Sequence, residues 1–254
     1  MLAVRDLTLR FGAITAFADV SFDVAQGELL AVIGPNGAGK SSLFNVLSRV
    51  YEPQSGSVRL AGQDLLARHR SELAACGVAR SFQNLGLVGE LTALENVLVG
   101  RDHLMRCGAL RGGVGLARSE ERAHRDAARR ALATVGAQEL AQRVVQTLPY
   151  GDRKRVELAR CVAMEPRLML LDEPVAGMSA AERRDMTELV RRLHRDEGLT
   201  LVLVEHDMGM VMRVADRVLV LDFGRPIAIG TPAEVQQDER VIRAYLGEEL
   251  AVGA

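Results

Sequence analysis

The sequence predicts an α/β protein in which a mainly parallel sheet is joined to an antiparallel β subdomain and interrupted by a helical insert. Three observations support this prediction. Short apolar strands alternate with helices around Leu29–Ile33 and again from Leu168 onward. The first 33 residues contain three strand-like segments separated by turns, which favours antiparallel pairing. Between Leu85 and Met164 the pattern is mostly helical, without a strong strand signal.

The expected strands are short runs of apolar and β-branched residues that end at Gly, Pro or polar turns. They cover Leu2–Leu9, Asp19–Val24, Leu29–Ile33, Ser57–Leu60, Gly77–Ser81, Leu168–Leu171, Leu199–Val204 and Arg217–Leu221. A helix is expected to end near Val50, and short helices are expected over Pro232–Leu246.

Composition limits the possible classes of protein. A chain of 254 residues with a 48% hydrophobic fraction can form one large domain or two small lobes around a sizeable core. Its net charge of −1 gives no electrostatic support for a nucleic-acid partner. Cys76, Cys107 and Cys161 are scattered, which suits a reducing cytosol. The first residues resemble a strand rather than a signal peptide, and no apolar run approaches the length of a membrane span.

The most informative segment is a glycine-rich loop between an expected strand and an expected helix. It matches the phosphate-loop pattern G-x-x-x-x-G-K-[ST] through Gly34, Pro35, Asn36, Gly37, Ala38, Gly39, Lys40, Ser41 and Ser42. In such loops the backbone N–H groups and the helix N-terminus face phosphate oxygens. We expect Lys40 to reach the β- and γ-phosphates of a nucleotide and Ser41 to hold Mg²⁺.

The alternative interpretation of this loop is a glycine turn that precedes a lysine by chance. Lys40 and Lys154 are the only lysines among 32 basic residues, so a compact ammonium stands here in a chain that otherwise uses guanidinium groups. The composition makes such a chance match an event of about one in a thousand. Lysine usage therefore favours nucleotide binding.

Two adjacent acids follow the apolar segment Leu168–Leu171. This segment predicts a buried strand that delivers Asp172 and Glu173 at its carboxyl end, where open parallel sheets bind ligands. We expect Asp172 to hold Mg²⁺ through water and Glu173 to polarise the attacking water. Alone, the motif would equally describe a strand that ends in two solvated acids, and the phosphate loop decides between the two interpretations.

A loop that enters a helix precedes these acids and consists of Leu148, Pro149, Tyr150, Gly151 and Asp152. Its simplest interpretation is an ordinary helix start. However, the segment and its spacing to Asp172 resemble the signature motif of ABC-type ATPases. Three further residues resemble functional positions of that family: Gln83 its Q-loop glutamine, His206 its switch histidine, and Phe11 the aromatic residue that stacks on adenine.

Within this superfamily the chain looks most like the branched-chain amino acid uptake ATPases. The resemblance is carried by Arg80–Asn84 (RSFQN), the LPYG form of the signature, His206–Met212 (HDMGMVM) and Val241–Gly247 (VIRAYLG). Two positions depart from the common pattern of ABC ATPases. Pro149 replaces the signature serine that touches the γ-phosphate of the partner's nucleotide, and Ser179 stands where the D-loop usually has Asp.

The resemblance implies a P-loop, RecA-like core over residues 1–84 and 162–231, a helical signature subdomain over 85–161, and a helical tail over 232–254. It implies ATP and Mg²⁺ as cofactors and adds Ala16 to the nucleotide-binding residues and Gln83 to the metal site. It also implies hydrolysis of two ATP molecules between two ABC ATPase subunits, identical or different. The hydrolysis would drive integral membrane permease subunits, so the chain would lie in the cytoplasm, peripheral to the inner face of the plasma membrane.

Three hypotheses for function remain open from the sequence. The favoured one is the ATP-hydrolysing subunit of an importer, with a branched-chain amino acid as the expected solute. The alternative within this class is an importer or exporter ATPase for urea, an amide, another amino acid or a lipid. The second is an ABC ATPase not coupled to transport, which usually carries long coiled-coil inserts or tandem cassettes. The third is a P-loop kinase, which would need neither a signature loop nor a switch histidine.

The helical insert contains two segments of unusual composition. Cys107–Ala117 is rich in glycine and lacks periodicity, which predicts a mobile loop. The charged stretch Ser119–Ala133 fits a solvated helix face, with a lipid or membrane-partner contact as the weaker alternative.

Overall fold

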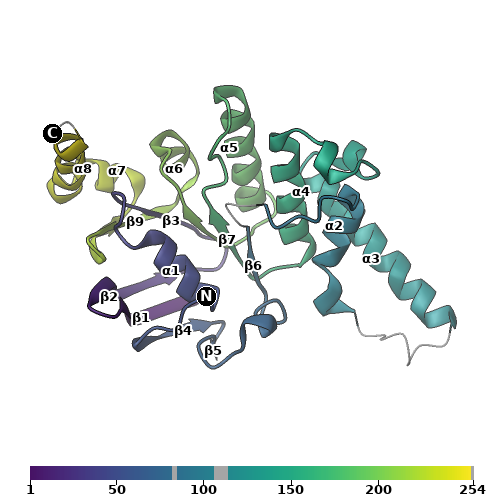
Figure 1. Ribbon diagram of the computed structural model, residues 1–254, viewed down its shortest axis with the longest axis horizontal. Coiled ribbons are helices and arrows are strands. Elements are labelled where there is room, and N and C mark those ends of the chain that lie inside the picture. Colours follow the sequence, from purple (N-terminus) through teal and green to yellow (C-terminus); the bar gives the residue numbers. More distant parts are fainter. Residues whose placement is uncertain (82–84, 106–113, 253–254) are drawn as a thin grey trace.

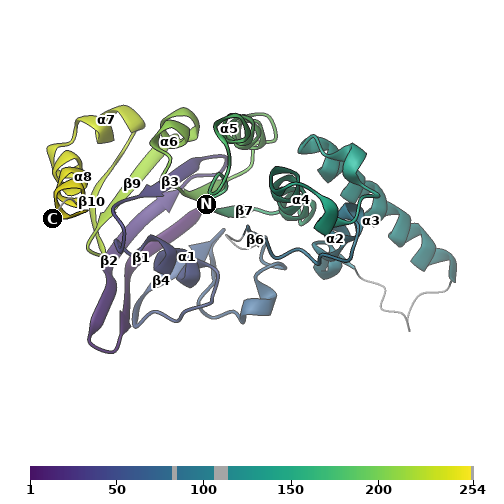
Figure 2. The same cartoon turned by 45° about the horizontal axis from the view of Figure 1, so that its top comes forward.

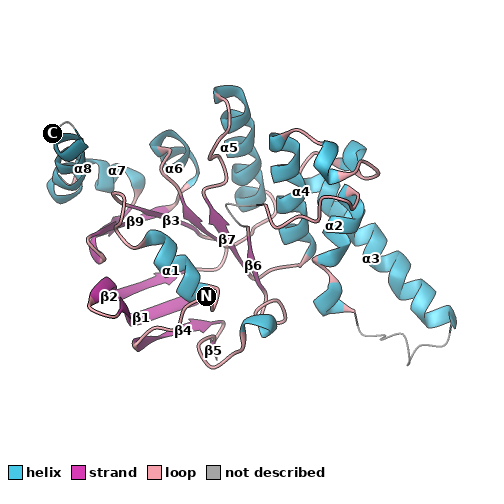
Figure 3. Ribbon diagram, viewed as in Figure 1, coloured by secondary structure: helices cyan, strands magenta, loops and turns pink. Residues whose placement is uncertain are grey.

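The structure is a computed structural model that describes residues 1–81, 85–105 and 114–252 (Figure 1). In this part of the chain, strands form two sheets and helices pack on both faces of the larger sheet (Figure 3). The strands are β1 (Leu2–Phe11), β2 (Ile14–Val24), β3 (Leu29–Ile33), β4 (Ser55–Leu60), β5 (Gln63–Asp64), β6 (Val78–Arg80), β7 (Leu168–Asp172), β8 (Leu201–Val204), β9 (Arg217–Asp222) and β10 (Arg225–Gly230).

The helices follow the strands in an α/β order. The α-helices are α1 (Lys40–Leu47), α2 (Ala93–Val99), α3 (Val114–Thr134), α4 (Tyr150–Ala163), α5 (Ala180–Arg195), α6 (Met208–Val214), α7 (Pro232–Gln237) and α8 (Glu239–Val252). Short 3₁₀ turns are η1 (Arg70–Glu72), η2 (Asp102–Leu104), η3 (Gln138–Leu140) and η4 (Val145–Thr147).

The larger sheet has the strand order β10-β9-β3-β8-β7-β6 and is parallel except for β10. Its central strand β3 is buried along its whole length, and its side chains alternate between two hydrophobic cores. Leu30 and Val32 enter the core beneath the sheet, whereas Ala31 and Ile33 enter the core that α5 and α6 cover. Because both faces of β3 are buried, its sequence is a continuous run of apolar residues.

The smaller sheet is antiparallel, with the order β2-β1-β4-β5. It faces the larger sheet across α1, and Figure 2 shows α1 beside β1 and β4 in this layer. Phe17 of β2 and Phe44 of α1 are fully buried in the core that the two sheets share. The core thus fixes α1, and with it the loop that precedes α1, against both sheets.

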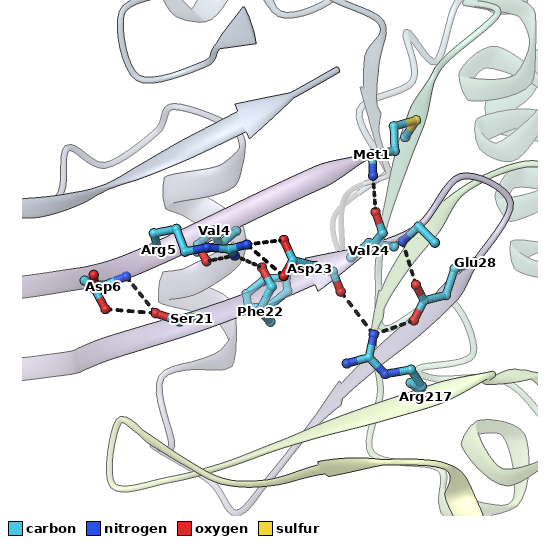
Figure 4. A network of polar contacts seen from close by, with 11 residues as sticks. Met1, Val4, Arg5, Asp6, Ser21, Phe22, Asp23, Val24, Glu28 and Arg217 are labelled. Atoms are coloured by element: carbon cyan, nitrogen blue, oxygen red, sulfur yellow. Dashed lines mark hydrogen bonds and ion pairs between the residues drawn. The ribbon is translucent and has the colours of Figure 1, made fainter. Parts of the chain in front are cut away.

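A polar network joins the two sheets at the turn between β2 and β3 (Figure 4). Arg217 of β9 donates to the Asp23 carbonyl at 3.3 Å and to Glu28 Oε1 at 3.0 Å. Glu28 Oε2 also accepts from the backbone N–H of Ala25 at 2.6 Å. One carboxylate therefore closes the turn and ties it to the neighbouring strand.

Several helices begin with a reciprocal side-chain cap. Thr92 before α2, Ser179 before α5 and Thr231 before α7 each accept from the third helical residue, a Glu that in turn accepts from the cap's backbone N–H. These capping boxes satisfy backbone groups that the helix itself leaves open. The helical insert consists of α2, α3 and α4, which pack on one another beside β6.

The prediction of an α/β fold with an antiparallel subdomain and a helical insert is confirmed. Two strands, β5 and β10, were not expected from the sequence: β5 is a pair of exposed polar residues, and β10 begins with Arg225 and Pro226 and contains no buried residue. The prediction of a loop over Cys107–Ala117 is wrong for its last residues, because α3 begins at Val114. Residues 106–113 lie outside the described part of the chain. No described helix combines the length and apolar character that crossing a bilayer requires.

The contact between the sheets makes a prediction about Gly224, which follows β9 at φ 74°. A Cβ there would lie 2.6 Å from the Ala16 carbonyl oxygen and 2.7 Å from Phe17 Cα, both backbone atoms. At Gly62, with φ 82°, a Cβ would meet nothing within 4 Å. We expect Gly224→Ala to lower the free energy of unfolding by about 1–3 kcal/mol more than Gly62→Ala, because only the former adds a clash to the backbone strain. Denaturant unfolding of both variants measures the difference, and equal losses would contradict the close approach.

Candidate nucleotide-hydrolysis site

The phosphate loop leaves the carboxyl end of β3 and enters α1. Gly34, Gly37 and Gly39 all have positive φ, as this tight path requires. A Cβ on Gly39 would lie 2.5 Å from the Ala16 carbonyl oxygen, so the loop passes directly against β2. The structure thus brings Ala16, which the sequence placed in the nucleotide site by resemblance, beside the loop.

Lys40 is buried, with only 5% of its surface exposed. Its Nζ donates to the carbonyl oxygens of Gly34 at 2.6 Å and Pro35 at 2.8 Å. The lysine therefore lies along the inner side of its own loop. Ser41 is exposed at the start of α1, and Ser42 is half-buried behind it.

Phe11 lies at the end of β1 and remains 45% exposed. Its ring packs edge-to-face on Tyr51, with 5.0 Å between the ring centroids and an interplanar angle of 79°. Edge-to-face packing fixes the ring plane while the ring keeps an open face for another aromatic group. The sequence reasoning did not identify Tyr51, which lies just after α1 and is far from Phe11 along the chain.

Asp172 is the last residue of β7 and pairs with Val204 of β8, which in turn pairs with Val32 of β3. Parallel register therefore places this acid on the sheet edge where the phosphate loop begins. Asp172 is 8% exposed, and its Oδ2 accepts from Arg80 Nη2 at 2.7 Å. Its backbone N–H donates to the hydroxyl of Ser81 at 3.2 Å.

Glu173 leaves the strand with φ 47°, an unusual value for a residue with a side chain. Its backbone N–H still donates to the Val204 carbonyl at 2.9 Å, but the conformation turns the side chain away from that of Asp172. Glu173 Oε1 lies 3.0 Å from Nε2 of His206, which follows β8. The structure thus brings together the carboxylate and the imidazole that the sequence predicted as catalytic.

Glu205 precedes His206 in the chain, holds its backbone, and is only 3% exposed. Its Oε2 accepts from the backbone N–H groups of His206 at 2.8 Å and Asp207 at 3.0 Å, and its Oε1 accepts from Val175 at 3.1 Å. Burial raises the pKa of this carboxyl, and the three backbone donors act against that rise. One buried acid therefore connects the segments after β7 and β8.

The signature segment lies at the start of α4. Leu148 is buried, Pro149 is exposed as the N-cap residue, and Asp152 lies in the first turn. A Cβ on Gly151 would lie 3.1 Å from Glu182 Oε1, in the capping box of α5. The start of α4 therefore packs against the start of α5. The N-cap residue of α5 is Ser179, the second position that departs from the common pattern of ABC ATPases.

Gln83 lies outside the described residues, so its expected roles in catalysis and metal binding stay predictions. Other members of the site were missed by the sequence reasoning. Arg80 stands inside the motif Arg80–Asn84, and Glu205 directly precedes the motif His206–Met212. The available signal for both was a charged residue at the end of an otherwise apolar strand. Tyr51 gave no local signal.

Comparison with known proteins decides the family. The profile described as "ABC transporter" matches residues 17–176, and a second profile, described as "Branched-chain amino acid ATP-binding cassette transporter", matches residues 225–251. The chain is 39% identical to the high-affinity branched-chain amino acid transport ATP-binding protein LivG of Escherichia coli (strain K12) over 251 residues, 98% of each protein. The chain belongs to the ABC transporter family.

Two further comparisons agree with this assignment. BraF of Pseudomonas aeruginosa, named a high-affinity branched-chain amino acid transport ATP-binding protein, is 39% identical over 98% of each chain. A crystal structure of an ATP-binding cassette of an ABC transporter in its ADP conformation aligns with a TM-score of 0.83 at 28% identity, covering 98% of this chain and 99% of that one. The chain is therefore an ABC ATPase.

We predict that Glu205→Gln weakens the site of this ABC ATPase. A glutamine would place an NH₂ group where a carboxylate oxygen now accepts from a backbone N–H, so one hydrogen bond to a charged group is lost. The free energy of unfolding should fall by about 1.5–3 kcal/mol, and turnover should fall because the backbone of His206 is less firmly held.

Denaturant unfolding and steady-state ATPase rates measure the two effects. Glu139→Gln, a change of the same size on the surface, is the matched control. A Glu205→Gln variant as stable and as active as this control would show that the buried carboxylate has no supporting role.

Proposed function

We propose that this chain is the ATP-hydrolysing subunit of an importer for branched-chain amino acids. The observation that carries the proposal is the pairing of Glu173 with His206 at the edge where the phosphate loop leaves the sheet. The solute is supported by the names of LivG and BraF and by the match over residues 225–251. A sulfate/thiosulfate import ATP-binding protein of Bradyrhizobium diazoefficiens is 35% identical, so another solute is the alternative outcome of the transport test.

In this proposal, each residue at the carboxyl ends of these strands has its own role in binding or hydrolysing ATP. Lys40 and the N–H groups of the phosphate loop hold the ATP phosphates, while Phe11 and Ala16 contact the adenosine part. Glu173 accepts a proton from the attacking water, and His206 holds that carboxylate by its Nε2 contact. A positive φ at a non-glycine residue costs conformational free energy. In this proposal, the strained backbone of Glu173 is retained because it directs the side chain toward the phosphates.

The donor groups at this edge fit Mg²⁺. Mg²⁺ prefers oxygen ligands and is usually bound by one or two protein groups together with substrate phosphates. The hydroxyl of Ser41 and the carboxylate of Asp172 are such donors, with Gln83 as a further expected ligand. When bound, the ion would supply positive charge to the phosphates.

The signature segment serves a second subunit in this proposal. Pro149 is exposed and offers neither a hydroxyl nor an N–H, so contacts to a partner's nucleotide must come from the backbone near Gly151 and from the N-terminus of α4. Head-to-tail pairing would give each ATP a phosphate loop from one subunit and a signature segment from the other. The partner is a copy of this chain or a related ABC ATPase.

A groove supports docking of a permease. It has a volume of about 460 Å³ and lies between η1 and β6 on one side and the helical insert on the other. Its lining includes Arg80, Val99, His103, Arg160 and Met164. A short cytoplasmic helix of a permease would bind in this groove and would hold the ATPase at the inner face of the plasma membrane.

We expect Glu173→Gln to bind ATP normally and to lose about 10²–10⁴-fold in turnover, because it removes the general base and keeps the shape of the side chain. The variant should also form a longer-lived ATP-bound dimer. Nucleotide binding, phosphate release and size-exclusion chromatography test the three expectations. Glu197→Gln, on the exposed turn after α5, is the control; turnover by Glu173→Gln at the control's rate would refute the proposed base.

Transport is tested in cells that lack the gene. We expect uptake of leucine, isoleucine and valine at low external concentration to fall to background and to return when the wild-type gene is restored. The Glu173→Gln gene should not restore it. A defect confined to sulfate, urea or another solute would overturn the proposed substrate, and normal uptake of all solutes would overturn a role in import.

A further inference from the structure

Arg80, the last residue of β6, makes contacts in three directions from a site that is 10% exposed. Its Nη2 donates to Asp172 Oδ2 at 2.7 Å. Its Nη1 donates to Asn45 Oδ1 on α1 at 2.8 Å and to the hydroxyl of Ser48, the C-cap residue of that helix. Its guanidinium carbon lies 5.8 Å from the ring centroid of Phe44 on the same helix. One planar cation therefore connects the acid at the end of β7 with the helix that follows the phosphate loop.

A purely structural explanation is that Arg80 pins the short edge strand β6 to α1. Stability alone is a weak reason for this arrangement, because a buried ion pair repays its desolvation poorly compared with apolar side chains of similar volume. The ion pair instead fixes the orientation of the Asp172 carboxylate. A rigid guanidinium held by α1 fixes which oxygen of Asp172 faces inward and which faces away.

The acid is constrained a second time through its backbone. Its N–H donates to the hydroxyl of Ser81, the residue after Arg80, at 3.2 Å. Neighbouring residues at the end of β6 thus hold both the main chain and the carboxylate of Asp172. Such control of both rotamer and position is typical of groups that orient a metal ligand from behind.

We propose that Arg80 is a positioning residue that orients Asp172 toward Mg²⁺ relative to α1, which carries Ser41. This inference rests on the proposed metal role of Asp172. Because α1 and β7 are held by one side chain, the two expected protein donors to the metal keep a fixed separation. Arg80 thus acts on the affinity for Mg²⁺ in the nucleotide complex and leaves the contacts of the phosphate loop to ATP itself unchanged.

The test measures binding of a fluorescent ATP analogue to the full chain, once in EDTA and once in saturating Mg²⁺. The ratio of the two dissociation constants is the magnesium enhancement. Arg80→Met should reduce this enhancement by about 10–100-fold, the usual loss when a group that orients a metal ligand is removed. The dissociation constant in EDTA should stay within about twofold of the wild-type value, since Lys40 and the loop N–H groups are untouched.

Arg101→Met is the matched control. Arg101 is 8% exposed and pairs with Glu165 at 2.9 Å in the helical part of the molecule, away from Asp172. We expect it to lose stability in the same way as Arg80→Met and to keep the full magnesium enhancement. If both variants lose stability and both keep the enhancement, Arg80 is merely structural and the inference is overturned. A larger enhancement in Arg80→Met would overturn it as well.

Two further variants separate this inference from the proposed function. Asp172→Asn should lose the enhancement, and adding Arg80→Met to it should cause no further loss. If Asp172→Asn keeps the enhancement, the proposed metal site itself is wrong. If Asp172→Asn loses it while Arg80→Met keeps it, only the role of Arg80 is wrong.

Should Arg80→Met fail to fold, Arg80→Lys decides the question. Lysine keeps the charge but cannot reach both Asp172 and α1 with a planar fork. Its enhancement should lie between the wild-type value and that of Asp172→Asn. A wild-type enhancement in a folded Arg80→Lys would show that charge alone, without orientation, is sufficient, and would overturn the inference.

Discussion

The complete burial of β3 between β8 and β9 is the constraint on which the nucleotide site depends. Because both faces of this strand lie in hydrophobic cores, its register with its neighbours cannot slip without exposing an apolar row. The same register aligns Val32, Val204 and Asp172 along one edge. The phosphate loop, the carboxylates and the histidine therefore meet because the core fixes where three strands end.

Two neighbouring acids at this edge have different surroundings, and the backbone causes the difference. Asp172 still has strand geometry, so its carboxylate lies beside β6 and pairs with Arg80. Glu173 adopts a positive φ and contacts His206 instead. Two acids that are consecutive in the chain thus have different partners, a cation for Asp172 and an imidazole for Glu173, which is consistent with the different roles proposed for them.

The two lysines of the chain show how far a rare residue type can guide interpretation. Lys40 lies in the phosphate loop and donates to two carbonyl oxygens of that loop. Lys154 is 2% exposed within α4 and pairs with the fully buried Glu157 at 3.4 Å. Rarity alone would have assigned both to function, whereas the pairing with Glu157 on the same helix places the second lysine in the packing of the helical insert.

The sequence by itself determined the fold class, the family and the order of the motifs, because these depend on local patterns: an apolar strand, a glycine-rich loop, a helix start. Tertiary structure alone decided the partners of those motifs. Arg80, Tyr51 and Glu205 act on residues that are distant in the chain or that turn toward them only after folding. Strands β5 and β10 likewise depend on neighbours, since each contains no buried residue and is held by pairing at a sheet edge. Local patterns record how a segment is buried, and the contacts between segments exist only once the chain has folded.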